Sequence, residues 1–218
     1  MHGLTSNRAG LLEQANLLVQ QGYGAFLMEL RGHGDSDGET TTLGFVEIND
    51  VEGAIDYLET RSDVNAEHFG IVGQSLGCIT SLRATGRFPE IDVLVAEACL
   101  TSIRDNVEDG VRTLANLPPF PFAPLVIFFG SQKAGVDIDQ VAPIEDVDAI
   151  APRPILFIHG TEDTLMRVEN SERLYAEYDG PKELYLIDGA FHYPLYSVDP
   201  IVFEEKLINF FQTNLPNK

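Results

Sequence analysis

The chain has 218 residues, of which 44% are hydrophobic, enough to bury the core of one domain. Its 34 acidic residues outnumber 14 basic ones and give a formal charge of −20. This balance argues against nucleic acid and anionic membranes as partners, because both bind clustered Lys and Arg. The acidic surplus fits either a surface adapted to high salt or an ordinary soluble acidic enzyme.

The sequence also indicates where the protein is located and the state of its cysteines. No apolar run reaches the roughly 20 residues of a membrane helix. Met1 is followed by His-Gly and not by a basic and then apolar leader. We therefore expect a cytoplasmic protein without a membrane partner. Cys78 and Cys99 stand in apolar surroundings, so we expect two reduced core thiols.

The first part of the chain is predicted to alternate helices and strands. The spacing of apolar residues predicts a helix over residues 9–21, a strand over 25–30 and a helix over 43–59. A glycine-rich turn containing His33 follows the strand. We expect His33 and His2 to hold loops by hydrogen bonding rather than to act as bases.

A serine joins the next strand to a helix. Residues 69–72 are a short buried strand, and the apolar residues after Cys78 recur at helical spacing. Between them lies Gly73-x-Ser75-x-Gly77. A side chain at the apex of so tight a turn needs neighbours without Cβ atoms. The turn exposes Ser75 at a helix N-terminus, where the backbone N–H of Leu76 can stabilise negative charge.

The second part continues the alternation around an insert. Strands are predicted over residues 91–98, 154–158 and 183–187, and helices over 168–178 and 201–211. With the two earlier strands, this makes five, which implies a parallel sheet. Residues 101–151 interrupt the pattern with a proline-rich, aromatic segment. These apolar residues fit a lid over the nucleophile, buried packing or a dimer contact.

Two polar turns supply the groups that a nucleophilic serine requires. Serine needs an imidazole to accept its proton and a carboxylate to orient that imidazole. Asp163 lies just past one predicted strand and His192 lies in the turn after the last one. Glu162 and Glu97 are alternative acids.

The order Ser75, Asp163, His192 resembles that of the α/β-hydrolase superfamily. His2-Gly3 is similar to the family's H-G turn, which implies that the Leu4 N–H supplies the second half of an oxyanion hole. Residues 29–36 are similar to its D-x-R-G-x-G-x-S turn, with Glu in place of Asp, and the H-G-x-x-D pattern favours Asp163 as the acid. The insert and the closing Gly-Ala-Phe-His most resemble serine-aminopeptidase-like and small carboxylesterase-like members.

The resemblance implies an α/β fold, with a mostly parallel sheet and helices on both faces. Residues 1–218 are expected to form a single domain, with 101–151 as a short helical lid. The strands that precede the H-G turn in the family have no counterpart, so we expect a truncated N-terminal part. Either an edge strand is left exposed and a second copy covers it, or the sheet is rebuilt. Since such an edge promotes association, we expect a homodimer.

The expected function is hydrolysis of short to medium acyl esters by Ser75, Asp163 and His192, with Leu4 and Leu76 binding the oxyanion. A peptidase or thioesterase with the same residues is an alternative, as is a non-catalytic binding module with an incomplete oxyanion hole. No phosphate-binding glycine loop or clustered metal-ligand set is present, so no cofactor is expected.

Overall fold

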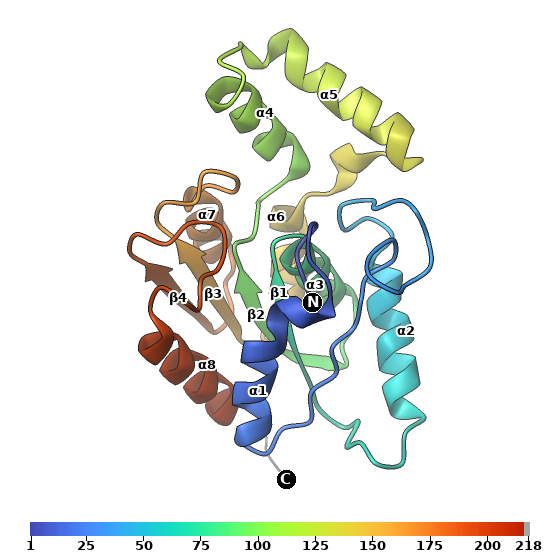
Figure 1. Cartoon of the computed structure of the whole chain (residues 1–218), viewed down its shortest axis with the longest axis vertical. Coiled ribbons are helices and arrows are strands. Elements are labelled where there is room, and N and C mark those ends of the chain that lie inside the picture. Colours follow the sequence, from blue (N-terminus) through green and yellow to red (C-terminus); the bar gives the residue numbers. More distant parts are fainter. Residues whose placement is uncertain (216–218) are drawn as a thin grey trace.

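The computed structural model describes residues 1–215. Within this range, four parallel strands form one sheet in the order β1-β2-β3-β4 (Figure 1). The strands are β1 (Phe69–Gln74), β2 (Ile91–Glu97), β3 (Ile155–Gly160) and β4 (Lys182–Ile187). Because all strands run in the same direction, their carboxyl ends share one edge, where parallel α/β sheets bind their ligands.

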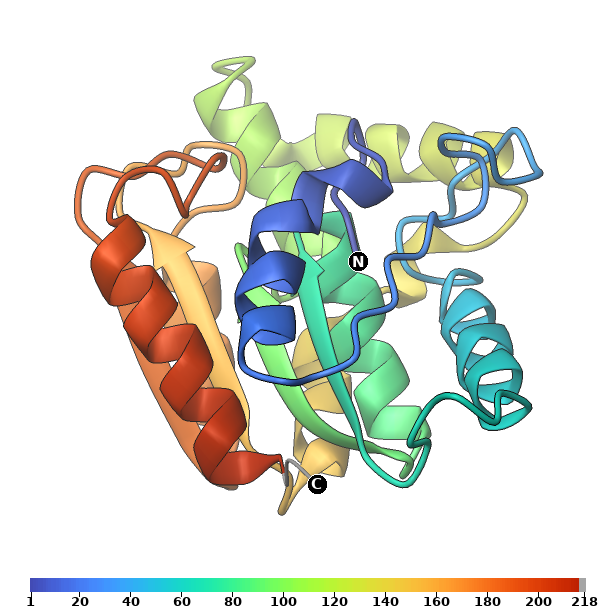
Figure 2. The same ribbon diagram turned by 60° about the horizontal axis from the view of Figure 1, so that its bottom comes forward.

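Helices cover both faces of the sheet, as the sequence predicts. Side chains alternate between the faces of a strand. The helices are α1 (Leu12–Gln20), α2 (Ile48–Glu59), α3 (Leu76–Arg87), α7 (Glu169–Glu177) and α8 (Pro200–Asn214). On β2, Val93 and Val95 pack with α1 and α8, whereas Leu94 and Ala96 pack with α3 and α7 (Figures 1 and 2). The α/β class is therefore confirmed.

The first part of the insert, with helices α4 and α5, stands above the carboxyl edge of the sheet (Figure 1), whereas Val147 and Ile150 near its end pack into the core beside the strands. It contains α4 (Ile103–Thr113), α5 (Pro119–Ala134), the 3-10 helix η2 (Ile138–Gln140), α6 (Pro143–Asp146) and the 3-10 helix η3 (Val147–Ile150). Hydrogen bonds from Ile103 N to Val141 O and from Ile144 N to Thr101 O tie its two ends together. On α5, Phe120 is 79% exposed and Phe129 64% exposed.

The predicted strand over residues 25–30 is wrong. This segment is irregular, so the described chain has four strands where five were expected. A strand needs a neighbour to bond with, and the free edge of β1 bonds to Met1 instead. Gln74 N donates to Met1 O, and the Met1 amino group donates to Val72 O. Leu30 N donates to the ring of His2.

Two predicted helices also differ at their starts. The predicted helix over 9–21 begins as a 3-10 turn, η1 (Arg8–Leu11), before α1. The helix predicted from residue 43 begins at Ile48. Leu43 and Gly44 both have positive φ angles, which no helix accepts. The buried Glu47 carboxylate accepts bonds from Thr42 and from Gly44 N and so fixes this entry turn.

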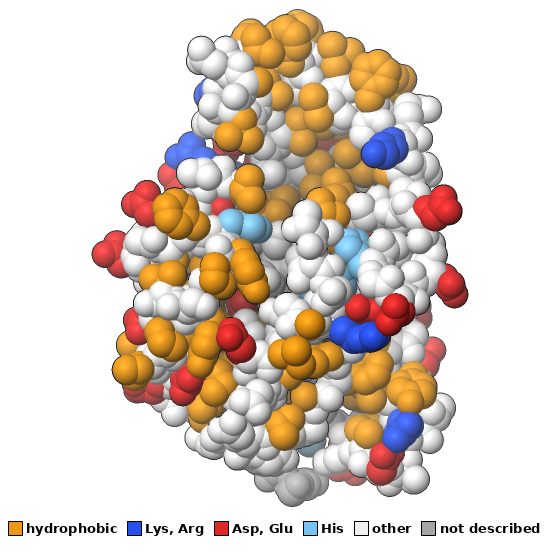
Figure 3. Space-filling view, viewed as in Figure 1, with side chains coloured by type: hydrophobic (Ala, Val, Ile, Leu, Met, Phe, Trp, Pro, Cys, Tyr) orange, Lys and Arg blue, Asp and Glu red, His pale blue; other side chains and the backbone are white. Residues whose placement is uncertain are grey.

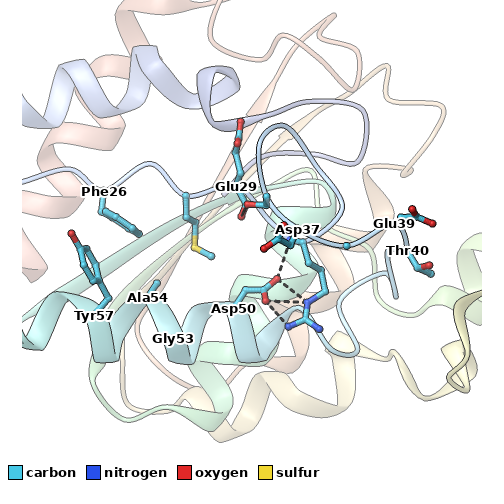
Figure 4. A pocket seen from close by; sticks show the side chains of 13 residues that line it. Phe26, Glu29, Asp37, Glu39, Thr40, Asp50, Gly53, Ala54 and Tyr57 are labelled. Atoms are coloured by element: carbon cyan, nitrogen blue, oxygen red, sulfur yellow. Dashed lines mark hydrogen bonds and ion pairs between the residues drawn. The ribbon is translucent and has the colours of Figure 1, made fainter.

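A surface pocket of about 730 Å³ lies between the irregular segment 25–30 and α2 (Figure 4). Phe26 and Tyr57 lie side by side at one end, and Asp50, farther along α2, forms an ion pair with Arg31. None of the residues that line it is a predicted site residue. The pocket is thus separate from the site described below.

Cys78 and Cys99 are joined in a disulfide, which corrects the expectation of two reduced thiols. Cys78 lies on α3 and Cys99 lies two residues beyond β2. Both cysteines are fully buried, and their Cα atoms are 5.4 Å apart. Apolar surroundings predicted burial correctly, but the pairing depends on how α3 packs against the end of β2.

Across residues 1–215, none of the helices is both long enough and apolar enough to cross a lipid bilayer.

Candidate active site

Ser75 lies at the apex of the turn between β1 and α3. Its φ of 55° and ψ of −117° are outside the regions that L-residues prefer. The flanking glycines allow this turn. A Cβ on Gly73 would lie 2.3 Å from Gly77 O, and one on Gly77 would lie 2.1 Å from Met1 O. The G-x-S-x-G pattern therefore has a steric cause at both glycines.

The structure brings Ser75, His192 and Asp163 together. His192 Nε2 lies 2.9 Å from Ser75 Oγ, and His192 Nδ1 lies 2.6 Å from Asp163 Oδ2. A carboxylate only accepts, so His192 Nδ1 carries a proton and Nε2 is free to accept the serine proton. Such an arrangement can transfer a proton from Ser75 as it attacks an electrophile.

Asp163 is buried, and its carboxylate accepts four hydrogen-bond contacts. The backbone N–H groups of Leu165 and Met166 donate to Oδ1, each at 2.9 Å. His192 and His159 approach Oδ2. Burial by itself would raise the pKa of Asp163, but the bonds from His159 and His192 outweigh it and hold the pKa well below its usual range. Asp163 is therefore a carboxylate at neutral pH.

Backbone hydrogen bonds join the loops that carry Asp163 and His192 beyond the end of the sheet. Thr161 N donates to Ile187 O, and Glu162 N donates to Ala190 O. Gly160 permits this approach, because a Cβ there would lie 2.3 Å from Ala190 O. The acid loop and the histidine loop therefore form one unit built on β3 and β4.

Two backbone N–H groups, one next to Ser75 in the chain and one next to Gly3, are candidates to bind an oxyanion. Those of Leu76 and Leu4 donate to no acceptor within the described chain. Gly3 lies against the serine, since a Cβ on it would be 3.3 Å from Ser75 Cβ. His33 Nε2 holds Leu4 O at 2.8 Å, so this histidine secures the loop as expected. The buried His2 does the same for Leu30.

The alternative acids do not reach His192. Glu97 is fully buried beneath the site, and Gln14 Nε2 lies 3.4 Å from each of its carboxyl oxygens. Burial raises the pKa of Glu97 to about 7. Glu162 is exposed to solvent.

One neighbour of Asp163 was not predicted from the sequence. His159, the histidine of the H-G-x-x-D pattern, is fully buried and lies 3.2 Å from Asp163. Its spacing of four residues from Asp163 was the available signal. In residues 1–215, no three His, Cys, Asp or Glu side chains gather closely enough to hold a metal ion.

Hydrophobic side chains surround the approach to the site. Figure 3 shows them over the insert at the top of the molecule, above a hollow with histidine atoms at its lower side. Around the site loops, Leu165, Phe191 and Tyr193 are each more than half exposed. The approach therefore favours an apolar ligand.

Comparison with known proteins gives consistent similarities. The family described as X-Pro dipeptidyl-peptidase (S15 family) matches residues 3–122, more than half of the chain. YqkD of Bacillus subtilis is 30% identical over 88% of this chain, and the chain spans 63% of that protein's length. The α/β hydrolase domain-containing protein WAV2 of Arabidopsis thaliana is 29% identical over 78% of this chain, and the match covers 54% of WAV2.

Among solved structures, the Pyrococcus furiosus esterase Pf2001 superposes with a TM-score of 0.78 at 24% identity. The superposition covers 99% of this chain and 82% of the esterase. At this level of identity, the likeness shows the fold.

Proposed function

This chain belongs to the X-Pro dipeptidyl-peptidase (S15) family and to the α/β-hydrolase superfamily, and we propose that within this class of hydrolases it is a carboxylesterase. Its substrates in this proposal are short to medium acyl esters, cleaved through an acyl-enzyme intermediate. The observation that carries the proposal is the continuous contact from Ser75 Oγ through His192 to Asp163.

In the proposed reaction, His192 Nε2 takes the proton from Ser75 as Oγ attacks the ester carbonyl. Asp163 keeps the proton of the neutral ring on Nδ1 and stabilises the imidazolium that forms. His192 then protonates the leaving alcohol, which leaves an acyl group on Ser75. Water, deprotonated by the same Nε2, attacks this acyl group; the bond to Ser75 Oγ then breaks, His192 returns the proton to Oγ, and the acid is released.

The tetrahedral oxyanion is proposed to accept hydrogen bonds from the N–H groups of Leu76 and Leu4. Their lack of other acceptors in the described chain and the packing of Gly3 on Ser75 support this role. Leu76 also begins α3, whose N-terminal end favours negative charge. A single oxyanion donor contributes on the order of 3 kcal/mol to transition-state stability.

We propose that residues 101–151 act as a lid that receives the acyl chain within a single domain. The support is the position of α4 and α5 above the carboxyl edge and their exposed apolar side chains (Figures 1 and 3). No charged residue other than Lys133 occurs on α5. An apolar wall of this kind suits a hydrocarbon chain better than a peptide.

Peptide hydrolysis is the second candidate, because the matched family is described as a dipeptidyl-peptidase. Such an enzyme needs an acidic group to bind the substrate's amino terminus. Glu97 is fully buried and cannot reach a substrate, and Asp105 forms an ion pair with Arg173. Of the acids considered, Glu162 is exposed beside the site. Among these acids, Glu162 is thus the one candidate left for that role, and we prefer the ester because apolar side chains surround the approach to the site.

The test is hydrolysis of p-nitrophenyl esters from acetyl to long acyl chains by the parent and the Ser75→Ala variant. Thioesters and an Ala-Pro anilide serve as parallel substrates. We expect turnover of esters with an optimum at short or medium chains, and none by Ser75→Ala. Preference for the anilide would instead support a peptidase. Equal rates for parent and variant on every substrate would support a non-catalytic binding module.

A further inference from the structure

Asp163 contacts two histidines. His192 Nδ1 lies 2.6 Å from Asp163 Oδ2, and His159 Nε2 lies 3.2 Å from the same oxygen. The side chains of His159 and Asp163 are both fully buried. Since His159 touches neither Ser75 nor the approach to it, its effect on the site must pass through Asp163.

The contacts of His159 determine where its proton lies. Nε2 faces two groups that only accept hydrogen bonds, namely the carbonyl of Met166 at 2.6 Å and the carboxylate of Asp163. Nε2 therefore carries a proton in either charge state of the ring. On the other side, Nδ1 lies 2.6 Å from Ser171 Oγ, whose hydroxyl can donate to it.

These contacts tie the loop from Asp163 to Met166 to both Asp163 and His159. Met166 donates its N–H to Asp163 Oδ1 and accepts from His159 through its carbonyl. His159 belongs to β3, so it joins the loop to the sheet. The carboxylate is thereby held from both of its oxygens, which leaves Oδ2 oriented toward His192.

We propose that His159 is a positioning residue, which fixes the Asp163 loop and shares the negative charge of Oδ2 with His192. This inference rests on the proposed function of Ser75, Asp163 and His192. Loss of the Nε2 donor leaves more negative charge facing His192, so the His192 imidazolium persists to higher pH. The expected result is a slower reaction with an acid limb displaced upward in pH.

Other charged groups near His159 bear on this reasoning. Glu169, at the start of α7, is close enough to interact electrostatically with His159. Glu169 also forms an ion pair with Arg167. These two charges are exposed and oppose each other, whereas Asp163 and His192 face the ring inside the protein. The pH effect is therefore assigned to the buried groups.

A matched pair of substitutions isolates the Nε2 donor. In His159→Gln, the amide nitrogen stands the same number of bonds from Cα as Nε2, so the donor to Asp163 is kept. In His159→Asn, the amide reaches only the position of Nδ1 and can contact Ser171. Ser171→Ala is the control that removes the Nδ1 partner and keeps the Nε2 donor.

The assay is the pH profile of kcat and kcat/KM on the best p-nitrophenyl ester. For His159→Asn, we expect kcat to fall about tenfold, only a part of the roughly 10²–10⁴-fold that general-base catalysis supplies, with little change in KM. Its acid limb should move up by about half a pH unit. His159→Gln and Ser171→Ala should keep the parent profile. If Asn and Gln variants of equal thermal stability have equal profiles, the inference is wrong.

Two further measurements keep the inference testable if esters fail or a variant does not fold. Labelling of Ser75 by a fluorophosphonate, in which Oγ displaces fluoride and His192 takes the proton, reports on the same groups without an ester. Labelling without ester turnover would refute the esterase but still rank the variants. Nitrogen NMR of the parent should find the His159 proton on Nε2. A proton on Nδ1 alone would overturn the inference, as would the absence of labelling.

Discussion

Replacing Glu97 with Gln should stabilise the protein at alkaline pH. Glu97 ends β2 and is fully buried. Its side-chain donor is Gln14 Nε2, at a long 3.4 Å from each carboxyl oxygen. Burial disfavours the charged form more than these weak contacts and the nearby Met1 amino group favour it. The pKa of Glu97 therefore rises from its ordinary 4.5 to about 7 in the folded protein.

The sign and size of the effect follow from this difference. Below pH 4.5, Glu97 is protonated in both the folded and unfolded states and does not change the free energy of unfolding. As pH rises from 4.5 to 7, the unfolded chain loses the proton first, so stability falls. Above pH 7, the loss is complete and amounts to about 3 kcal/mol. Gln is neutral throughout and avoids this loss.

Urea denaturation of the parent and Glu97→Gln at pH 5, 6, 7 and 8 measures the effect. The variant's advantage should be small at pH 5 and approach about 3 kcal/mol at pH 8. Glu205→Gln, at an exposed position on α8, is the control and should show no such trend. A gap that stays constant or shrinks with pH would refute the reasoning. Retained esterase activity in Glu97→Gln would also exclude Glu97 as the acid partner of His192.

Three further predictions concern the oxyanion loop, the disulfide and assembly. Gly3→Ala should lower kcat about tenfold in the ester assay, because its Cβ would lie 3.3 Å from Ser75 Cβ and displace the Leu4 N–H. Thiol titration of the unreduced, unfolded chain should find no free thiol, and reduction of Cys78–Cys99 should lower the free energy of unfolding by about 3 kcal/mol. We propose a homodimer, for which light scattering should give twice the mass of one chain; a single-chain mass at all concentrations would contradict it.

Local patterns in the sequence predicted those strands and helices that are marked by their own residues. The four observed strands are short apolar runs bounded by turns, and α3 follows directly from the G-x-S-x-G turn. Residues 25–30 carry the same pattern without forming a strand. A strand forms only when a neighbouring strand accepts and donates its backbone hydrogen bonds, and the residues of one segment do not determine that neighbour. The start of α2 was predicted wrongly for a related reason. The Glu47 contacts and the positive φ of Leu43 form a turn that the spacing of apolar residues does not reveal.

The positions of Ser75, Asp163 and His192 were predictable because each follows a strand of a parallel sheet. The carboxyl ends of such strands meet at one edge, so chain order translates into proximity. Contacts that depend on how side chains pack were less predictable in this way. The disulfide of Cys78 and the approach of His159 to Asp163 depend on packing distances, which residue types alone do not specify.

The site consists of two units with a strand between them. Ser75 and the N–H groups of Leu4 and Leu76 belong to the end of β1, the start of α3 and the first residues, whereas His159 belongs to β3, and Asp163 and His192 belong to the hydrogen-bonded loops beyond β3 and β4. β2 bonds to both sides: Ser75 N donates to Glu97 O, and Ala98 N donates to Ile158 O. The distance from Ser75 Oγ to His192 Nε2 is therefore set by the packing of β2, while the bond from His192 to Asp163 is set within one unit. Substitutions that shift β2 should therefore change the contact between Ser75 Oγ and His192 Nε2 and leave the bond between His192 and Asp163 intact.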